Sequence, residues 1–245
     1  MLKFILNSPA LLTNRTLVIA DLHLGIEHDI AKSGITIPSQ VNKIKKGIYE
    51  LLLKTRAKKL IILGDIKHKV PGLSWQELEE IPKFLKELSK RVKIIIIRGN
   101  HDSFIERLAP KSVDVISSAG LRINNIGLAH GHAWPKSELL GCEYLILAHC
   151  HPAIEFFSSG FRSIEPVWLR CPINKGAFER RYKRKCKLKQ AIVMPVFNPL
   201  IGGMAFNKPG FKPIGPLKAV IKWESGKVYL LDGTFLGKLK NLIKK

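Results

Sequence analysis

Cysteine is scarce in this sequence, and no two cysteines are close enough to form a CxxC pair. The chain has 245 residues and only four cysteines, which are irregularly spaced: Cys142, Cys150, Cys171 and Cys186. A structural zinc site normally shows closer cysteine pairs, and disulfides are rare in cytosolic proteins. We therefore expect four ordinary thiols that are buried or half-buried.

Long apolar runs are lacking too. The longest are short, such as residues 94–97, whereas about 18 apolar residues are needed to cross a bilayer. The brief apolar stretch near the N-terminus is interrupted by Asn7, Ser8 and Pro9, which is unlike a signal peptide. Because 46% of the residues are hydrophobic, a globular core is expected. The sequence predicts a cytoplasmic protein with a single domain over residues 1–245 and no membrane contact.

Acidic residues are few relative to basic ones. The chain has 19 Asp and Glu against 41 Lys and Arg, which gives a formal net charge of +22. A field of this sign attracts phosphates and polyanions. A thermophilic or generally basic proteome would give a similar surface without a nucleic-acid partner. The charge favours nucleic acid and leaves the second explanation open.

Short apolar runs that end in polar loops organise the first part of the chain. Such runs predict buried strands at residues 17–20, 60–63, 92–97, 126–129 and 144–148. Helical spacing predicts helices over about residues 39–55 and 74–90. Ser74 and Glu77 predict a capping box at the start of the second helix, and Pro82 leaves open a kink or two shorter helices. Alternating strands and helices predict parallel strands with functional residues at their carboxyl ends.

The pattern changes after residue 151. Short apolar runs between Gly and Pro turns predict strands at residues 167–170, 191–196, 217–223 and 227–231. We expect these strands to form a second, more antiparallel sheet. The dense basic stretch at residues 175–189 predicts an exposed loop or hairpin tip.

Seven potential metal ligands follow the predicted strands of the first 151 residues. A lone strand-end residue of this kind is usually a cap or a solvated side chain, but coincidence at five strand ends is improbable. Mixed nitrogen and oxygen ligands suit Mn, Fe or Zn better than Mg or Ca. Seven ligands suit two ions about 3.5–4 Å apart that share a carboxylate. Two of the ligand pairs are spaced i, i+2, and on extended backbone the two side chains of such a pair point to the same side of the strand. The ligands are Asp21 with His23, Asp65, Asn100, His130, and His149 with His151.

These residues form motifs in a recognisable order. They are D-L-H from Asp21, G-D-I-K-H from Gly64, G-N-H-D from Gly99, H-G-H from His130 and A-H-C-H from Ala148. The chain resembles the calcineurin-like metallophosphoesterase superfamily over about residues 15–155. The segments F-N-P-L-I-G-G (197–203) and L-L-D-G-T (230–234) resemble its SbcD-related and PdeM-like branch. This resemblance implies an α/β fold, a four-layer α-β-β-α sandwich of two mixed β-sheets flanked by helices.

The resemblance also implies roles for the site residues. Asp21, His23 and His151 would hold one divalent ion, Asn100, His130 and His149 the other, and Asp65 would bridge them. His101 corresponds to the catalytic histidine, which protonates the leaving oxygen or stabilises charge on the phosphoryl group. Asp102 either orients His101 or caps the following turn. His68 matches the histidine of the nuclease branch and is expected to contact phosphate. Mn²⁺ is the expected metal, with Fe, Zn and Ni as alternatives.

The expected activity is hydrolysis of phosphodiester bonds by a hydroxide that the two ions activate, with DNA as substrate of a repair endonuclease. Basic residues of the stretch 175–189 are candidates for DNA contact, with Tyr182 between them to stack on a base; a solvated charged face is the alternative. A helicase or ligase is the expected protein partner, and the oligomeric state is left open. The candidate DNA-contact residues are Arg180, Arg181, Lys183, Arg184 and Lys185.

Two other functions remain open. One is hydrolysis of a small phosphodiester such as a cyclic nucleotide. The other is a non-catalytic scaffold on the same fold, although such proteins usually lose ligands that are all retained here. A second basic group at a predicted helix end, Lys54, Arg56, Lys58 and Lys59, either binds a polyanion or complements the helix dipole.

Overall fold

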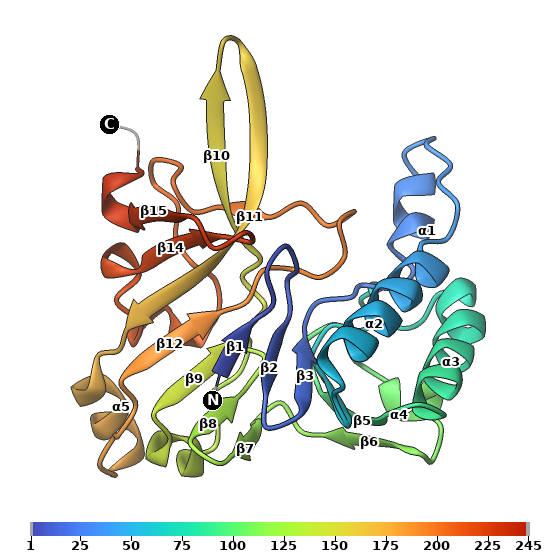
Figure 1. Ribbon diagram of the computed structural model, residues 1–245, viewed down its shortest axis with the longest axis horizontal. Coiled ribbons are helices and arrows are strands. Elements are labelled where there is room, and N and C mark those ends of the chain that lie inside the picture. Colours follow the sequence, from blue (N-terminus) through green and yellow to red (C-terminus); the bar gives the residue numbers. More distant parts are fainter. Residues whose placement is uncertain (1, 244–245) are drawn as a thin grey trace. The chain divides into compact units, whose positions relative to one another are not determined.

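The computed structural model describes residues 2–243, whose contacts divide into two compact units. Unit 1 comprises the chain up to Phe4, Ala10–Ser117 and Phe197–Ile201, and unit 2 comprises Ile5–Pro9, Ser118–Val196 and the chain from Gly202 onward. Each unit is built on one mixed sheet (Figure 1). The expected α/β class with two mixed sheets and helices is confirmed. The expectation of one domain over residues 1–245 stays a prediction.

Unit 1 contains a six-stranded sheet in the order β1-β2-β3-β4-β5-β6. Strands β1 (Leu2–Phe4), β2 (Leu11–Thr13) and β3 (Thr16–Ile19) form an antiparallel meander. Strands β3, β4 (Lys59–Leu63), β5 (Lys93–Ile97) and β6 (Val113–Ile116) run parallel. The predicted parallel strands are therefore present. Their continuous Ile and Leu runs are almost entirely buried, as expected for strands covered on both faces.

The two predicted helices connect these strands. Helix α2 (Val41–Thr55) presents Val41, Ile44 and Ile48 to the core. Helix α3 (Trp75–Ser89) begins with the predicted capping box, in which Ser74 and Glu77 bond to each other's backbone N–H groups. It is a single helix that contains Pro82. The shorter helices α1 (Ile26–Ala31) and α4 (Ile105–Leu108) complete this unit.

Unit 2 contains a nine-stranded sheet. Its main path is β13-β10-β11-β12-β9-β8-β7, with β14 paired to β11 and β15 paired to β14. The bounds are β7 (Leu121–Ile123), β8 (Ile126–Leu128), β9 (Tyr144–Leu147), β10 (Pro152–Ser158), β11 (Phe161–Pro172), β12 (Gln190–Val193), β13 (Met204–Ala205), β14 (Lys227–Leu230) and β15 (Phe235–Lys238). Five pairings are antiparallel, and β8-β9, β9-β12 and β10-β13 are parallel. The expectation of a more antiparallel second sheet is confirmed.

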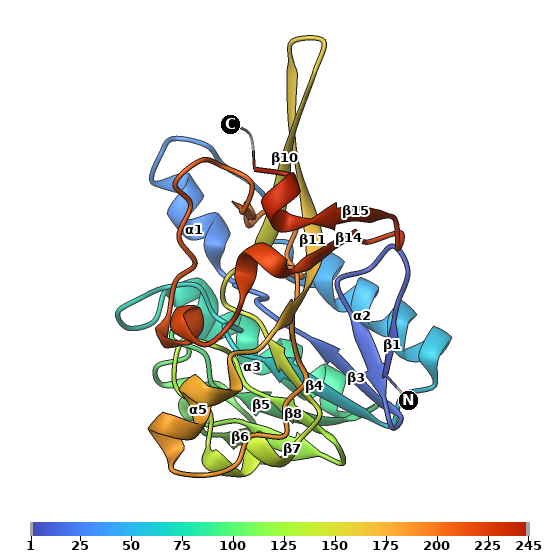
Figure 2. The same ribbon diagram turned by 90° about the vertical axis from the view of Figure 1, so that its left-hand side faces the viewer.

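Strands β10 and β11 form a hairpin longer than the sequence indicated. The predicted strand at residues 167–170 is only the last part of β11. The distal part of this hairpin extends beyond the rest of its sheet in both views (Figures 1 and 2). Its exposed residues alternate little in polarity, so the periodicity gave no strand signal there.

Two predictions for the second unit were wrong. Residues 175–189 begin with a helix, α5 (Lys175–Tyr182), because the Asn174 side chain caps Ala177 N–H and Phe178 is buried. Residues 217–223 are not a strand. They overlap the 3-10 helix η2 (Pro216–Ala219) and reach the first residue of η3 (Trp223–Ser225), since Leu217, Val220 and Ile221 are buried at helical spacing.

The remaining 3-10 helices are η1 (Ser137–Gly141) and η4 (Leu239–Asn241). All four cysteines are buried thiols, as expected. Cys150, which stands between two predicted ligands, packs in the core of unit 2. Among residues 2–243, no helix is both long enough and apolar enough to traverse a lipid bilayer.

Candidate active site

The predicted ligands of unit 1 lie at the carboxyl ends of β3, β4 and β5. Asp21 and His23 follow β3, Asp65 follows β4, and Asn100 follows β5. Asp21, His23 and Asp65 are at most 3% exposed, whereas Asn100 is exposed. The imidazole Nε2 of His23 lies 3.8 Å from Asp65 Oδ2. Buried carboxylates are retained in proteins where they are paired or coordinate metals.

The backbone at these ligands differs from the extended form that the sequence suggested. Asp21, His23 and Asp65 have φ of 56°, 41° and 51°, in the left-handed region. Non-glycine residues adopt this region at a cost, and such residues cluster at functional sites. The side chains are therefore directed by tight turns after the strands, and the i, i+2 alternation of a strand does not apply to them.

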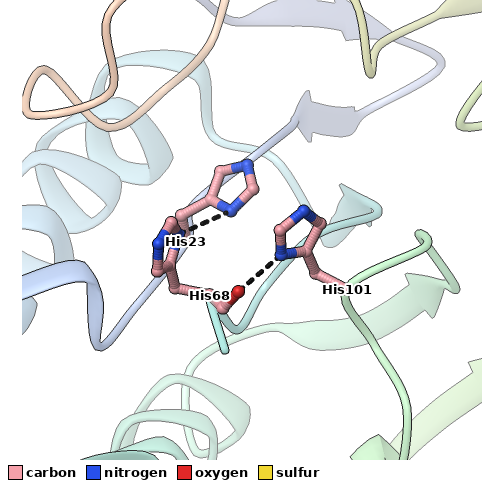
Figure 3. Close-up of side chains that lie close together, drawn as sticks. All are labelled: His23, His68 and His101. Atoms are coloured by element: carbon pink, nitrogen blue, oxygen red, sulfur yellow. Dashed lines mark hydrogen bonds between the residues drawn. The ribbon is translucent and has the colours of Figure 1, made fainter. Parts of the chain in front are cut away.

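Three imidazoles meet at this edge of unit 1 (Figure 3). The ring centroids of His23 and His101 are 4.8 Å apart, and those of His23 and His68 are 5.3 Å apart. His68 Nδ1 lies 3.4 Å from His23 Nδ1. One nitrogen from each ring lies within 4.8 Å of the others, a spacing that also suits metal coordination. The structure thus brings together His68 and His101, the two candidate catalytic histidines, with the predicted ligand His23.

The His101 side chain has a defined orientation. Its Nδ1 lies in hydrogen-bond contact with the backbone oxygen of His68. Because a carbonyl oxygen only accepts, Nδ1 carries the hydrogen and Nε2 is left for other chemistry. The backbone N–H of His101 donates to Asp65 Oδ1 at 2.8 Å. His101 is therefore fixed both to the loop of Asp65 and to that of His68.

The Asp102 carboxylate bonds to the backbone of two loops, and its predicted roles in orienting His101 or capping the following turn stay predictions. Its buried carboxylate accepts hydrogen bonds from the backbone N–H groups of Gly99 and Asp65 on Oδ2, at 2.7 and 2.8 Å. Its Oδ1 accepts from Ile66 at 2.8 Å and from Lys67 at 3.4 Å. The side chain thus joins the loop after β5 to the loop after β4.

Gly99 permits these two loops to approach closely. A Cβ atom at this position would lie 2.0 Å from Asp65 Oδ1 and 2.4 Å from Asp65 N. Neither contact is sterically possible, so only glycine fits beside Asp65 without displacing one loop.

Glu77 and Lys67 stabilise the loop of His68, and sequence reasoning gave them no role in the site. Glu77 Oε1 accepts from the backbone N–H groups of His68 and Lys69, at 2.9 and 2.7 Å. The buried Lys67 ammonium donates to the backbone oxygens of Lys69 and Gly72. Burial lowers the pKa of Lys67, which the carboxylate of Glu77 partly opposes. The capping-box motif was the sequence signal for Glu77, but it suggested only a helix start.

Asp29 is another neighbour that the sequence did not single out. Its Oδ2 lies 3.4 Å from His68 Nε2. Burial lowers the pKa of His68, and Asp29 opposes that shift while His101 adds to it. A hydrogen bond from Lys32 lowers the pKa of Asp29 itself. Asp29 lies in α1, a short helix for which no periodic pattern was evident.

Asn198 belongs to the segment F-N-P-L-I-G-G, which the sequence offered only as a family resemblance. This fully buried side chain donates to the backbone oxygen of Leu22 at 2.8 Å. The backbone N–H of Phe197 donates to Ala20 O at 3.0 Å. The segment therefore holds the turn that contains Asp21 and His23.

Unit 2 contributes the remaining predicted ligands at the carboxyl ends of its parallel strands β8 and β9. His130 follows β8 and is fully buried, and its ring centroid lies 5.0 Å from that of His149. His132 Nδ1 is 2.8 Å from His130 Nδ1. His149 and His151 follow β9 with φ of 69° and 40°, so their backbone repeats the left-handed turns of unit 1. The structure brings His130, His132 and His149 together.

The predicted DNA-contact residues lie in a helix and a loop, and not at the ends of strands like the predicted metal ligands. Arg180 and Arg181 lie in α5, and Lys183, Arg184 and Lys185 lie in the loop that follows, all exposed.

Tyr182 is less available for base stacking than expected. Its hydroxyl donates to Pro135 O, and its ring stacks on Phe178 with centroids 6.2 Å apart. The Arg181 guanidinium lies 4.0 Å from the centroid of the Trp134 ring.

Comparison with known proteins agrees with this chemistry. The family model described as calcineurin-like phosphoesterase matches residues 14–163. The structure resembles nuclease MPE from Pseudomonas putida, with 21% sequence identity and a TM-score of 0.56 over 91% of this chain and 89% of that chain. YfcE, a phosphoesterase from E. coli, shows 15% identity and a TM-score of 0.41 over 91% of this chain and 97% of that one. A comparison with curated protein sequences finds no match.

The likeness to the Pseudomonas nuclease shows the shared fold, and the likeness to YfcE is too weak to add to it. The family match covers most of the chain and includes the motifs from Asp21 to His151. The chain belongs to the calcineurin-like phosphoesterase family, whose members use divalent metal ions, and it is a hydrolase that acts on phosphoester bonds.

Proposed function

We propose that the chain is a Mn²⁺-dependent phosphodiesterase that cleaves DNA, as an endonuclease in repair. The observation that supports this most directly is the cluster of His23, His68 and His101 (Figure 3), in which His23 lies beside the buried carboxylate of Asp65. A phosphodiester has two ester oxygens and a charged centre, so its hydrolysis requires both charge stabilisation and protonation of the leaving oxygen.

The chemistry of the donor set fits divalent metal ions. Asp21, His23, Asp65 and Asn100 supply oxygen and nitrogen donors in unit 1, and His130, His149 and His151 supply imidazoles in unit 2. Mixed donors of this kind suit Mn, Fe, Zn or Ni. When bound, two such ions supply Lewis acidity at phosphorus and an activated water. We propose the assignment by motif, with Asp65 as the shared ligand.

The histidines then have separate roles. We propose that His101, in its doubly protonated imidazolium form, delivers a proton from Nε2 to the leaving oxygen and is left neutral with its hydrogen on Nδ1. The hydrogen bond from Nδ1 to the His68 carbonyl supports this role, because it fixes the ring orientation and keeps the Nδ1 hydrogen in place while Nε2 loses its proton. We propose that His68, which is partly accessible beside Asp29, binds a phosphoryl oxygen when protonated.

A nucleic-acid substrate is supported by charge and by likeness of fold. The net charge is +22, and residues 180–189 contain seven Lys and Arg residues and no Asp or Glu. A nuclease is among the proteins that share the fold. A helicase or a ligase is the protein partner that we propose to test first.

The test compares substrates under a single set of conditions. After chelation, Mn²⁺ is added back and cleavage of single-stranded DNA, a cyclic nucleotide and bis-p-nitrophenyl phosphate is measured from low to high salt. Cleavage of DNA should fall steeply with salt, because phosphate contacts release counterions. A flat salt response, or turnover of the cyclic nucleotide alone, would contradict the DNA assignment while leaving the phosphodiesterase assignment intact.

A further inference from the structure

Unit 1 has a cluster of positive charge of its own, separate from the cations of α5 in unit 2. This cluster surrounds a cavity of about 570 Å³. Four of its lining residues are cationic, and none is acidic. Its volume lies within the range of small-ligand pockets, roughly 300–1,000 Å³. The cationic residues are Arg15, Arg56, Lys58 and Arg91.

This cavity lies at the opposite ends of the strands from the candidate active site. Arg15 directly precedes β3, Lys58 directly precedes β4, and Arg91 lies two residues before β5. The register pairs Thr16 with Lys59 and Lys59 with Lys93, so the three cations occupy neighbouring positions along the amino edge of the parallel strands. His23 and His101 follow the carboxyl ends. The two sites are therefore separated by at least the length of a five-residue strand, roughly 16 Å.

Within residues 2–243, no ion pair neutralises the positive charges around the cavity. Over residues 2–243, none of the four side chains forms an ion pair with a carboxylate or a hydrogen bond. Arg56 lies at the carboxyl end of α2, where the helix dipole favours a cation. That explanation does not extend to Arg15 or Arg91. Like charges directed at one cavity repel each other, and a bound anion relieves the repulsion.

The cavity also offers a flat apolar surface. The half-buried ring of Tyr49 lies beneath the guanidinium of Arg91, whose carbon is 5.1 Å from the ring centroid. Leu53, on the next turn of α2, is 76% exposed. Planar aromatic and guanidinium groups stack on nucleobases, and arginine binds phosphate through two parallel N–H groups. An inorganic anion alone would leave this apolar surface exposed.

We infer that this cavity binds a nucleotide, with its phosphate on Arg15 and Lys58 and its base against Tyr49 and Leu53. The nucleotide is either free or a unit of a nucleic-acid strand, since both present the same phosphate and base. The inference is independent of the proposed DNA cleavage, because no residue of the candidate active site takes part.

The experiment uses a photoreactive nucleotide, 8-azidoadenosine 5′-phosphate, on the full chain with its metals, followed by peptide mapping. Labelling should be saturable and should map to residues 49–58. Displacement by AMP alone identifies a free nucleotide, and displacement by a ten-residue oligothymidylate identifies a strand. Absence of label in this segment overturns the inference. Displacement by inorganic phosphate as effective as that by AMP also overturns it, because a base would then contribute nothing.

A charge-matched pair of variants tests the residues themselves. Arg15→Ala/Arg91→Ala should raise at least tenfold the concentration of AMP or oligothymidylate that displaces half of the label. Lys58→Ala provides a milder single change. Lys43→Ala/Lys86→Ala removes two exposed charges that do not line the cavity and should change affinity less than twofold. All variants should hydrolyse bis-p-nitrophenyl phosphate at the wild-type rate. Equal affinity in the double variant and its control refutes the assignment.

Discussion

Replacement of Asp102 by Asn tests the connection between the two loops that position Asp65 and His101. The carboxylate accepts four backbone N–H groups, three of them at 2.7–2.8 Å and the fourth at 3.4 Å. Asn keeps one acceptor oxygen and replaces the other with an NH₂ group. Two buried N–H donors would then face a donor, and each unsatisfied group costs about 1–3 kcal/mol. The free energy of unfolding should therefore fall by about 2–6 kcal/mol.

The assay is urea or thermal unfolding of the wild type and the variant. For a chain of this size each kcal/mol lowers Tm by about 2–4 °C, so a decrease on the order of 10 °C is expected. Asp114→Asn is the matched control, because Asp114 is exposed and its ion pair with Lys93 lies at the surface. That control should shift stability by less than about 1 kcal/mol. If Asp102→Asn is as stable as Asp114→Asn, the anchoring role is refuted.

Three further predictions concern Gly99, His101 and Cys171. Gly99→Ala should lower both activity and metal affinity, because the new Cβ would lie 2.0 Å from Asp65 Oδ1. A variant with wild-type kcat and metal content would contradict this prediction, because the two loops would then separate without loss of function. His101→Gln should reduce turnover of bis-p-nitrophenyl phosphate by about 10²–10⁴-fold with both metals retained, and unchanged kcat rejects the proton-donor role. Burial, with a smaller contribution from Cys150, raises the pKa of Cys171 to about 12 from 9.0. The native state thus favours the neutral thiol, so the free energy of unfolding should fall as the pH rises from 9 to 12. Cys171→Ala should make this decline with pH less steep. An equal slope in the wild type and the variant would contradict the prediction.

The strand ends were predictable because the sequence patterns there are local. Continuous apolar runs identified β3, β4 and β5, and the polar residue after each run gave the positions of Asp21 and Asp65. The backbone of those turns was not predictable in the same way. Left-handed φ values at non-glycine residues depend on long-range contacts, such as the hydrogen bond from Asn198 to Leu22 O across 176 positions of sequence.

The errors in unit 2 have a similar cause. Dense charge in residues 175–189 concealed the i, i+4 pair of Phe178 and Tyr182, whose packing against Trp134 stabilises α5. The apolar residues of segment 217–223 fit both a strand and a short helix, and tertiary packing decides between them. Local propensity was sufficient where apolar runs were long and regular, and insufficient where a few buried contacts select the conformation.

The most direct test is an anomalous difference map, recorded at the Mn absorption edge from a crystal grown with Mn²⁺. We expect strong peaks within about 2.3 Å of ligand atoms from Asp65 and from His23 and His130. Peaks remote from these residues, or no peak in a crystal soaked in excess Mn²⁺, would contradict the proposed metal site.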